Sequence, residues 1–202
     1  MSQERQPPSP GAMPRPRVRG YTLLELLVVI IIIGVVSAIA FPNFQGMING
    51  NRLTGAANEL VTSFQIARSE AIRRNARVVM CPSANGTTCG GTDWRRHISF
   101  VDADRNVAAD DALVLRDTEI NPAIQVLGSP AITAANRIVF RSDGRARDNV
   151  TNAAAILAGK FSVCIVTTRP AANIRDVQIG SGSRLSVQAR SGAGACNAPT
   201  NI

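Results

Sequence analysis

A run of apolar residues near the N-terminus constrains this chain more than any other feature. Residues 26–41 carry no charge, and with the four residues from Tyr21 the run can cross a hydrocarbon layer of about 30 Å. Arginines at 15, 17 and 19 precede it, and such basic flanks hold that end of a membrane helix in the cytoplasm. Glu25 lies within the run, and a carboxylate in hydrocarbon costs about 2.5–3.5 kcal/mol. The segment therefore predicts a membrane-spanning helix with one acidic residue that needs a partner.

Three interpretations of Glu25 are open. In the first, the segment is a plain membrane anchor and Glu25 is tolerated near the interface. In the second, the segment is a secretory signal that is cut after the A-x-A pattern at Ala38–Ala40. In the third, cleavage after Gly20 creates a new amine on Tyr21, one helical turn from Glu25. Only the third interpretation gives Glu25 a partner, because a carboxylate can compensate this amine or that of a neighbouring copy.

The hexapeptide GYTLLE, Gly20 to Glu25, resembles the class III signal of type IV pilins and type II secretion pseudopilins. In that family prepilin peptidase cuts after the glycine and methylates the new N-terminus. The resemblance implies that residues 1–20 are a cleaved leader, that Gly20 and Tyr21 form the cleavage and N-methylation site, and that Glu25 acts in assembly. Tyr21 departs from the usual phenylalanine of this motif.

The implied partners are other pilins, minor pilins and the peptidase. The implied location is the inner membrane as a single-pass protein, then the periplasm and the cell-surface pilus tip.

Helical periodicity continues beyond the apolar run. Pro42, Gly46, Gly50 and Gly55 interrupt it and should make this stretch the most pliable part. The pattern then recovers at three- and four-residue steps, which predicts a helix over 21–75 whose second half packs on the remaining domain. The apolar positions of that half are Leu53, Ala57, Leu60, Phe64, Ala67 and Ala71.

From Arg77 onward the period changes to that of strands. Eight short segments rich in Val and Ile are separated by turn residues. They are RVVMC, HISFV, ALVLR, AIQVL, RIVFR, KFSVCIV, IRDVQIG and RLSVQ. They predict a β-rich head over 76–202, with one mostly antiparallel sheet or two small sheets laid against the helix. The expected class is α+β with the pilin-like fold that the resemblance implies.

Four cysteines predict two disulfides in an exported chain, and three pairings are possible. Cys81 and Cys89 bracket the turn-forming segment CPSANGTTC, which favours a bond between them and leaves Cys164 with Cys196. The alternative is four reduced thiols. A zinc site is not expected, because the chain has no CxxC motif and a single histidine.

No grouping of residues typical of an enzyme is found, so we predict neither catalysis nor a cofactor. His97, the single histidine, lies in a strand-like segment and is expected to be structural. Asp102 and Asp104 resemble the start of a calcium loop but lack its Gly and distal Glu, so an acidic turn is expected. Trp94 is expected to cap a core.

Positive charge is concentrated in the C-terminal third. The formal net charge is +8, and Lys160 is the only lysine. Residues 137–202 carry nine basic and three acidic residues, whereas residues 21–136 are close to neutral. A guanidinium is a planar fork suited to phosphate and carboxylate. If the leader is lost, only the basic C-terminal third can act in the mature protein.

The segment RIVFRSDGRARDN contains a turn signal, Ser142–Gly144, among four arginines: Arg137, Arg141, Arg145 and Arg147. Alternation should place Arg145 and Arg147 on one side, at or just past the loop tip, as a possible phosphate clamp. The alternative is that Asp143 and Asp148 form local ion pairs with them and merely solubilise the turn.

Gly144-Arg145-Ala146-Arg147 resembles the GRxR motif of the FimT subgroup of minor pilins, whose members bind DNA during natural transformation. The resemblance implies that Arg145 and Arg147 contact DNA independently of its sequence, with Arg141 a weaker candidate. On charge alone, Arg137, Lys160 and Arg184 are expected to extend the surface. The alternative is a FimU-like minor pilin, or a GspH-like pseudopilin of type II secretion, that primes assembly without binding DNA.

The assembly role of Glu25 is tested by Glu25→Val. We expect the variant to be inserted and cleaved normally but to assemble poorly into filaments, because the new amine of its neighbour loses its carboxylate partner. Immunoblotting of sheared filaments measures this. Normal piliation by the variant would refute the role.

Overall fold

The computed structural model describes residues 20–103, 113–148 and 155–202, without the side chains of residues 42 and 43. The chain divides into two compact units, with the boundary between residues 41 and 42. The predicted leader, with its arginines at 15, 17 and 19, lies outside the described residues except for Gly20. Asp104 also lies outside them.

Helix α1 spans Leu23–Arg74. Its apolar part is long enough to cross a membrane, and the large side chains of that part are exposed. The backbone stays helical through Pro42, Gly46, Gly50 and Gly55, so the expected interruption is not observed. A glycine lowers helix stability by about 1 kcal/mol and a proline by about 3 kcal/mol, and the long hydrogen-bonded segments on either side tolerate these costs.

Nine strands and a short helix follow α1 in the part of the chain that the structure describes. They are β1 (Arg77–Pro82), β2 (Arg96–Asp102), β3 (Val114–Glu119), β4 (Gln125–Gly128), α2 (Pro130–Thr133), β5 (Ile138–Phe140), β6 (Ala146–Arg147), β7 (Gly159–Cys164), β8 (Ile174–Ile179) and β9 (Leu185–Arg190). All eight predicted strand segments are present. The two elements that were not predicted, β6 and α2, are too short to show a periodicity.

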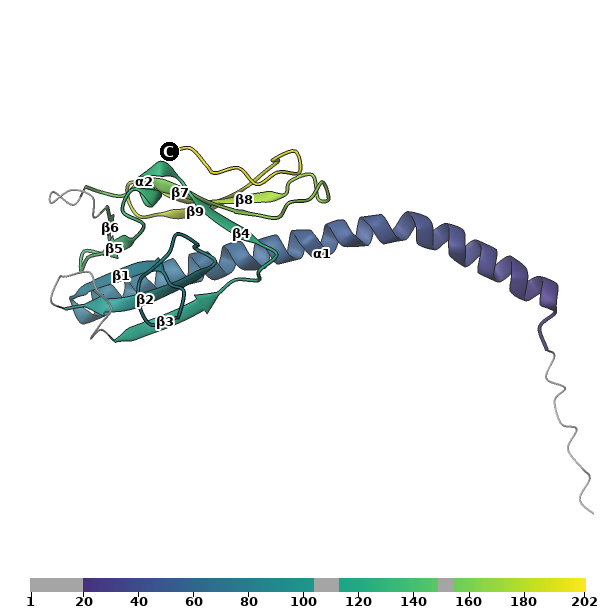
Figure 1. Cartoon of the computed structure of the whole chain (residues 1–202), viewed down its shortest axis with the longest axis horizontal. Helices are drawn as coiled ribbons and strands as arrows, with labels where there is room; N and C mark the ends of the chain where they lie inside the picture. Colours follow the sequence, from purple (N-terminus) through teal and green to yellow (C-terminus); the bar gives the residue numbers. More distant parts are fainter. Residues whose placement is uncertain (1–19, 104–112, 149–154) are drawn as a thin grey trace, which may run out of the picture. The chain divides into compact units, whose positions relative to one another are not determined.

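The strands form two sheets (Figure 1). One has five strands in the order β3-β2-β1-β5-β6, and the other has four in the order β4-β7-β8-β9. Every pairing between these strands is antiparallel. The predicted α+β class is therefore confirmed, with two sheets rather than one.

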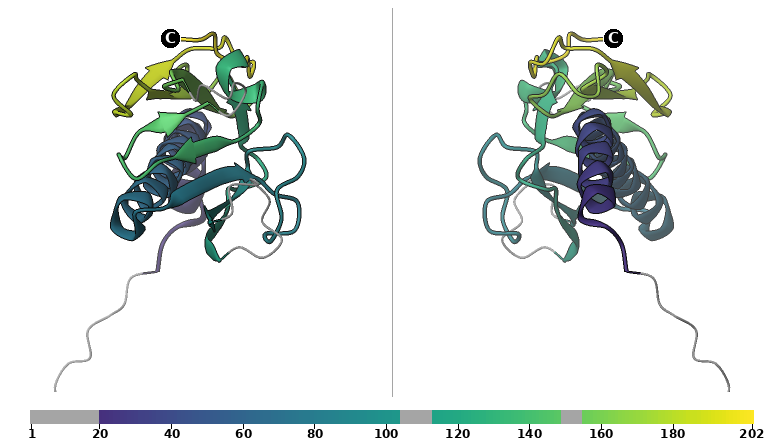
Figure 2. Two further views of the ribbon diagram at one scale, coloured as in Figure 1. Left: turned by 90° about the vertical axis from the view of Figure 1, so that its left-hand side faces the viewer. Right: turned by 90° about the vertical axis from the view of Figure 1, so that its right-hand side faces the viewer.

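The second half of α1 packs against both sheets (Figure 2). All six apolar positions predicted for this face are fully buried. Phe64 lies where the layers meet: its ring centroid is 6.4 Å from that of Phe140 in the five-stranded sheet and 5.6 Å from that of Phe161 in the four-stranded sheet. The helix thus supplies the centre of one core shared by the two sheets.

The remaining phenylalanine and tryptophan side chains of the head are also buried. Trp94 is 1% exposed, packs edge-on against Phe161 at 4.8 Å, and donates its indole N–H to Asn136 Oδ1 at 3.0 Å. Phe100 lies in a second apolar cluster on the five-stranded sheet. From residue 64 onward every phenylalanine and the single tryptophan therefore point inward, as expected for Trp94.

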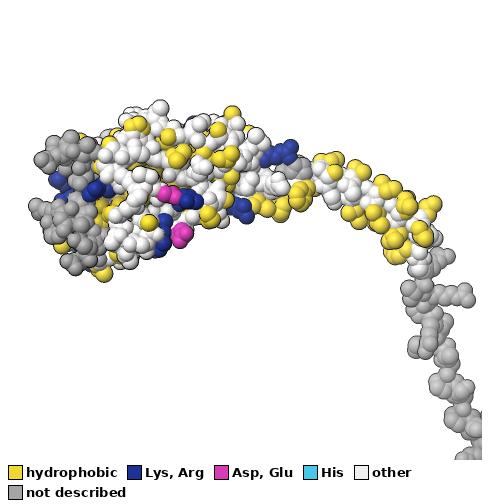
Figure 3. Space-filling view, in the orientation of Figure 1, with side chains coloured by type: hydrophobic (Ala, Val, Ile, Leu, Met, Phe, Trp, Pro, Cys, Tyr) yellow, Lys and Arg dark blue, Asp and Glu magenta, His cyan; other side chains and the backbone are white. Residues whose placement is uncertain are grey.

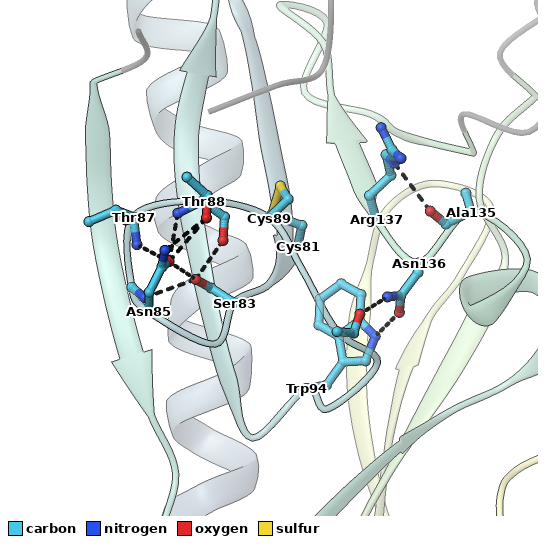
Figure 4. The surroundings of a disulfide bond; sticks show 12 residues. Cys81, Ser83, Asn85, Thr87, Thr88, Cys89, Trp94, Ala135, Asn136 and Arg137 are labelled. Carbon is cyan, nitrogen blue, oxygen red and sulfur yellow. Dashed lines mark hydrogen bonds between the residues drawn. A yellow bond between two sulfur atoms is a disulfide. The ribbon is translucent and has the colours of Figure 1, made fainter. Parts of the chain in front are cut away.

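Both disulfides have the predicted pairing. Cys81 bonds Cys89, and Cys164 bonds Cys196. The loop inside the first disulfide is organised by Asn85, whose Oδ1 accepts the backbone N–H groups of residues 87 and 88, both at 2.9 Å (Figure 4). Short-range hydrogen bonds of this kind are what the Asn and Gly residues of the segment predicted.

Replacing Phe64 with alanine should destabilise the globular unit by about 3–5 kcal/mol, because the cavity would lie between the helix and both sheets. Urea unfolding of the full chain in detergent, followed by the fluorescence of the single buried tryptophan, measures this. Val187→Ala, at a side chain 41% exposed on β9, is the control and should cost less than about 1 kcal/mol. Equal losses in the two variants would contradict the central position of Phe64.

Candidate nucleic-acid interface

The arginine motif lies in the tight turn between β5 and β6. Gly144 N donates to Arg141 O at 2.8 Å, and Arg141 N donates to Arg145 O at 3.2 Å, which closes the hairpin. Gly144 has φ +71°, in the left-handed region that glycine adopts without strain. The glycine of the motif therefore has a backbone role, and the arginine after it starts the return strand.

This turn rests on the last turns of α1. A Cβ built on Gly144 would lie 2.8 Å from Ile72 Cδ1 and 3.3 Å from Arg68 Nε. Glycine at this position therefore lets the loop backbone approach the helix closely. Arg68 was not predicted as part of the site; its only signal in the sequence is its position off the apolar helix face.

The two arginines of the motif differ in their surroundings. Arg145 is exposed, and its guanidinium makes no ion pair within the described part of the chain. Arg147 is only 19% exposed in its side chain, and its Nη2 lies 2.9 Å from Asp143 Oδ2. Ala146 between them is fully buried. Exposure falls from Arg145 to Ala146 and rises again at Arg147, and the local ion pair given as the alternative forms at Arg147, because residue 143 lies beside it across the turn.

Asp143 is held in its ionised form by the same loop. The backbone N–H of Arg145 donates to Asp143 Oδ1 at 2.9 Å, and this bond, with the Arg147 guanidinium as a second cause, lowers the pKa of the Asp143 carboxyl. The carboxylate therefore compensates one arginine charge at neutral pH. It leaves Arg145 to face solvent.

Two of the other candidate arginines lie near the motif. Arg141 is exposed and lines a pocket of about 470 Å³ between the end of α1, β2 and the turn. Arg184 is exposed and follows Ser183, whose hydroxyl accepts the N–H of Ala146 at 2.6 Å. Figure 3 shows dark-blue side chains at several places on this face of the head, some of them at the left-hand end of the view, where α1 ends. The term arginine cluster denotes five arginines: Arg68, Arg141, Arg145, Arg147 and Arg184.

Two candidates are not brought into this cluster. Arg137 precedes β5, at the end of that strand opposite the turn, and its Nε donates to Ala135 O at 3.1 Å (Figure 4). Lys160 lies on β7 in the four-stranded sheet, opposite Gln178. The expectation that both extend the surface rested on charge alone, which does not indicate the strand end or the sheet.

The other residues that could carry chemistry, His97 and Asp102, are buried within the head. His97 is 1% exposed; its Nδ1 lies 3.1 Å from Trp94 O, its Nε2 has no hydrogen-bond partner among the described residues, and burial lowers its pKa. Asp102 is buried at the end of β2 and lies 3.5 Å from Arg77 Nη2, so it is not part of the acidic turn that was expected. No cluster of metal-ligating side chains occurs within the described ranges.

The N-terminal motif forms a helix cap. Glu25 N donates to Thr22 Oγ1 at 3.2 Å, immediately before the helix begins at Leu23. This Thr-x-x-Glu arrangement is an N-terminal capping pattern that the sequence contained and that we did not predict. Gly20, Tyr21 and Glu25 are all exposed.

An apolar N-terminal helix that continues into a head of two antiparallel sheets, with its second half as their core, defines the class of type IV pilin-like proteins. The model of the type II transport protein GspH family matches residues 56–189, and that of the prokaryotic N-terminal methylation motif matches residues 15–41. The chain belongs to this GspH family of minor pilins and pseudopilins. Its motif and apolar helix fit a membrane-anchored pilin.

Individual relatives agree with this assignment. The pilin-like protein PilA1 of Thermus thermophilus is 42% identical over 90 residues, 44% of this chain and 51% of that protein, so the match spans about half of PilA1. Fimbrial protein Q of Moraxella bovis is 31% identical over 57% of this chain and 77% of its own length. The crystal structure of the type IV minor pilin FimU of Pseudomonas aeruginosa superposes with a TM-score of 0.50 at 20% identity, over 68% of this chain and 89% of FimU. This last similarity concerns the fold.

The close approach of Gly144 to α1 is tested by comparing Gly144→Ala with Gly91→Ala. Both glycines have positive φ, +71° and +80°, but a Cβ on Gly91 would meet nothing within 4 Å. Both variants incur left-handed strain of about 1–2 kcal/mol. Gly144→Ala should cost about 1 kcal/mol more, because Ile72 must move. Urea unfolding gives both values, and identical losses would show that contact with α1 does not constrain the turn.

Proposed function

We propose that this minor pilin binds DNA through the arginine cluster and delivers it for uptake in natural transformation. The observation that carries the proposal is the exposed guanidinium of Arg145, which makes no ion pair in the described residues and lies beside further arginines. Among the described residues, one arginine of the cluster forms an ion pair: Arg147 pairs with Asp143. Most of the cluster's positive charge is therefore left uncompensated by the described acidic side chains.

The arrangement favours phosphate over base recognition. Guanidiniums on a turn can reach the outer edge of a nucleic acid, where phosphates lie, without entering a groove. Neutralising phosphates releases counterions, so affinity should depend steeply on salt and little on sequence. The resemblance of Gly144–Arg147 to the GRxR motif supports the same ligand.

The proposal extends to the life cycle of the subunit. Prepilin peptidase would cut after Gly20 and methylate Tyr21, and Glu25 would meet the amine of an adjacent subunit during assembly. The head would then be presented at or near the pilus tip, where retraction draws bound DNA toward the uptake machinery. The match of the N-terminal methylation motif to residues 15–41 supports the proposed cleavage and methylation.

Binding is tested with the full chain in non-ionic detergent and two duplexes of unrelated sequence, by fluorescence anisotropy between about 50 and 200 mM salt. Wild-type protein should bind both duplexes alike. Arg145→Ala should weaken binding roughly tenfold, the effect of losing one charge-assisted hydrogen bond. It should also reduce the slope of log affinity against log salt by about 0.9, the value for one phosphate contact.

The matched control is Arg52→Ala, which removes an exposed arginine of α1 that makes no ion pair with described residues. It should leave affinity and slope nearly unchanged. Equal losses in the two variants would indicate an effect of net charge rather than a site. If the wild-type chain shows no affinity at low salt, DNA binding is refuted, and the remaining role is that of a subunit that primes assembly.

A further inference from the structure

Two hairpin turns next to each other share one backbone geometry. They are residues 141–145, between β5 and β6, and residues 180–184, between β8 and β9. In both turns the amide of the fourth residue donates to the carbonyl of the first at 2.8 Å, and the amide of the first donates to the carbonyl of the fifth, at 3.2 and 3.0 Å respectively. The fourth residue has positive φ in each, +71° at Gly144 and +54° at Ser183, and an arginine follows it.

The serine in the second turn needs an explanation. Glycine is the usual residue at this position of a hairpin, because a side chain is strained there. Ser183 nevertheless occupies it, 3% exposed. Residues persist in such backbone regions where surrounding contacts hold them in place. Two contacts do so: Ser183 Oγ accepts Ala146 N at 2.6 Å, and Ser183 O accepts Arg68 Nη1 at 3.1 Å.

The first of these contacts reaches the centre of the arginine motif. Ala146 is fully buried between Arg145 and Arg147, and its carbonyl accepts Leu157 N at 3.0 Å. Its N–H has Ser183 Oγ as its acceptor. A buried backbone N–H without an acceptor is strongly disfavoured. The Ser183 hydroxyl therefore restrains the position of the motif's backbone at Ala146.

We propose that Ser183 is a positioning residue for the arginine cluster. By accepting the N–H of Ala146 it fixes the directions in which Arg145 and Arg147 leave the backbone. It also docks the second turn, with Arg184, beside the first. A pre-ordered set of guanidiniums loses less conformational freedom on binding than a loose loop. The inference rests on the proposed DNA binding for its consequence, whereas the anchoring of Ala146 can be measured without any ligand.

The decisive variant is Ser183→Gly. Glycine suits the left-handed backbone, so a role confined to turn formation predicts equal or greater stability and no other effect. Anchoring predicts instead that the Ala146 amide exchanges with deuterium on the order of tenfold faster, because one hydrogen bond is lost. The urea midpoint should change little, because relief of the left-handed strain at residue 183 offsets that loss. Ser181→Gly is the matched control: it makes the same chemical change at an exposed position of the same turn and should leave this exchange unchanged.

Both variants are measured as the full chain in detergent, by NMR exchange without DNA and by duplex binding at several salt concentrations. Ser183→Gly should also weaken binding several-fold, and Ser183→Asn should restore part of both effects, because asparagine tolerates this backbone and carries an acceptor oxygen. Continued protection of Ala146 in Ser183→Gly would overturn the inference, as would unchanged affinity beside a binding wild type. If the wild type itself does not bind DNA, the proposed function fails, and the exchange rate of Ala146 alone decides whether Ser183 anchors the loop.

Discussion

The buried face of α1 is the contact on which the rest of the globular unit depends. Phe64 touches an aromatic ring of each sheet, and the residues one turn away on either side, Leu60 and Ala67, are fully buried. The two sheets are joined to each other chiefly by this shared core, which the helix completes. A hydrophobic helix face clamped between two antiparallel sheets therefore explains how a domain with many short strands holds one arrangement.

The same helix supports the candidate site. Its last turns bring Ile72 and Arg68 against Gly144, so the arginine turn lies on a rigid element and not on a free loop. Groups that must meet a ligand in a fixed geometry are best held in this way. The ion pair between Arg147 and Asp143 adds a second restraint within the turn. Packing, turn geometry and charge thus act on the same few residues.

Periodicity predicted the parts of this fold that depend on near neighbours in sequence. The helix face from Leu53 to Ala71, the eight strand segments and the loop closed by Cys81 and Cys89 all follow from local patterns. What the sequence did not reveal depends on contacts across long separations. Arg68 and Ser183 are 115 positions apart, and no spacing rule connects them.

The arginine motif itself was only partly predictable. Alternation is matched by the buried Ala146 between two less buried arginines, but it could not show that Arg145 faces solvent while Arg147 pairs with Asp143, since that depends on side-chain conformation. The two-residue strand β6 was missed for a related reason: it exists because β5 and the segment after it offer partners, not because of its own composition.

The inward direction of every aromatic ring from residue 64 onward limits the ways in which the head can hold a nucleic acid. Its surface offers no flat ring on which a nucleobase could stack, and base stacking is a principal means of holding single-stranded nucleic acids. Under the proposed function, the head would therefore hold nucleic acid through contacts to phosphates, which carry no sequence information.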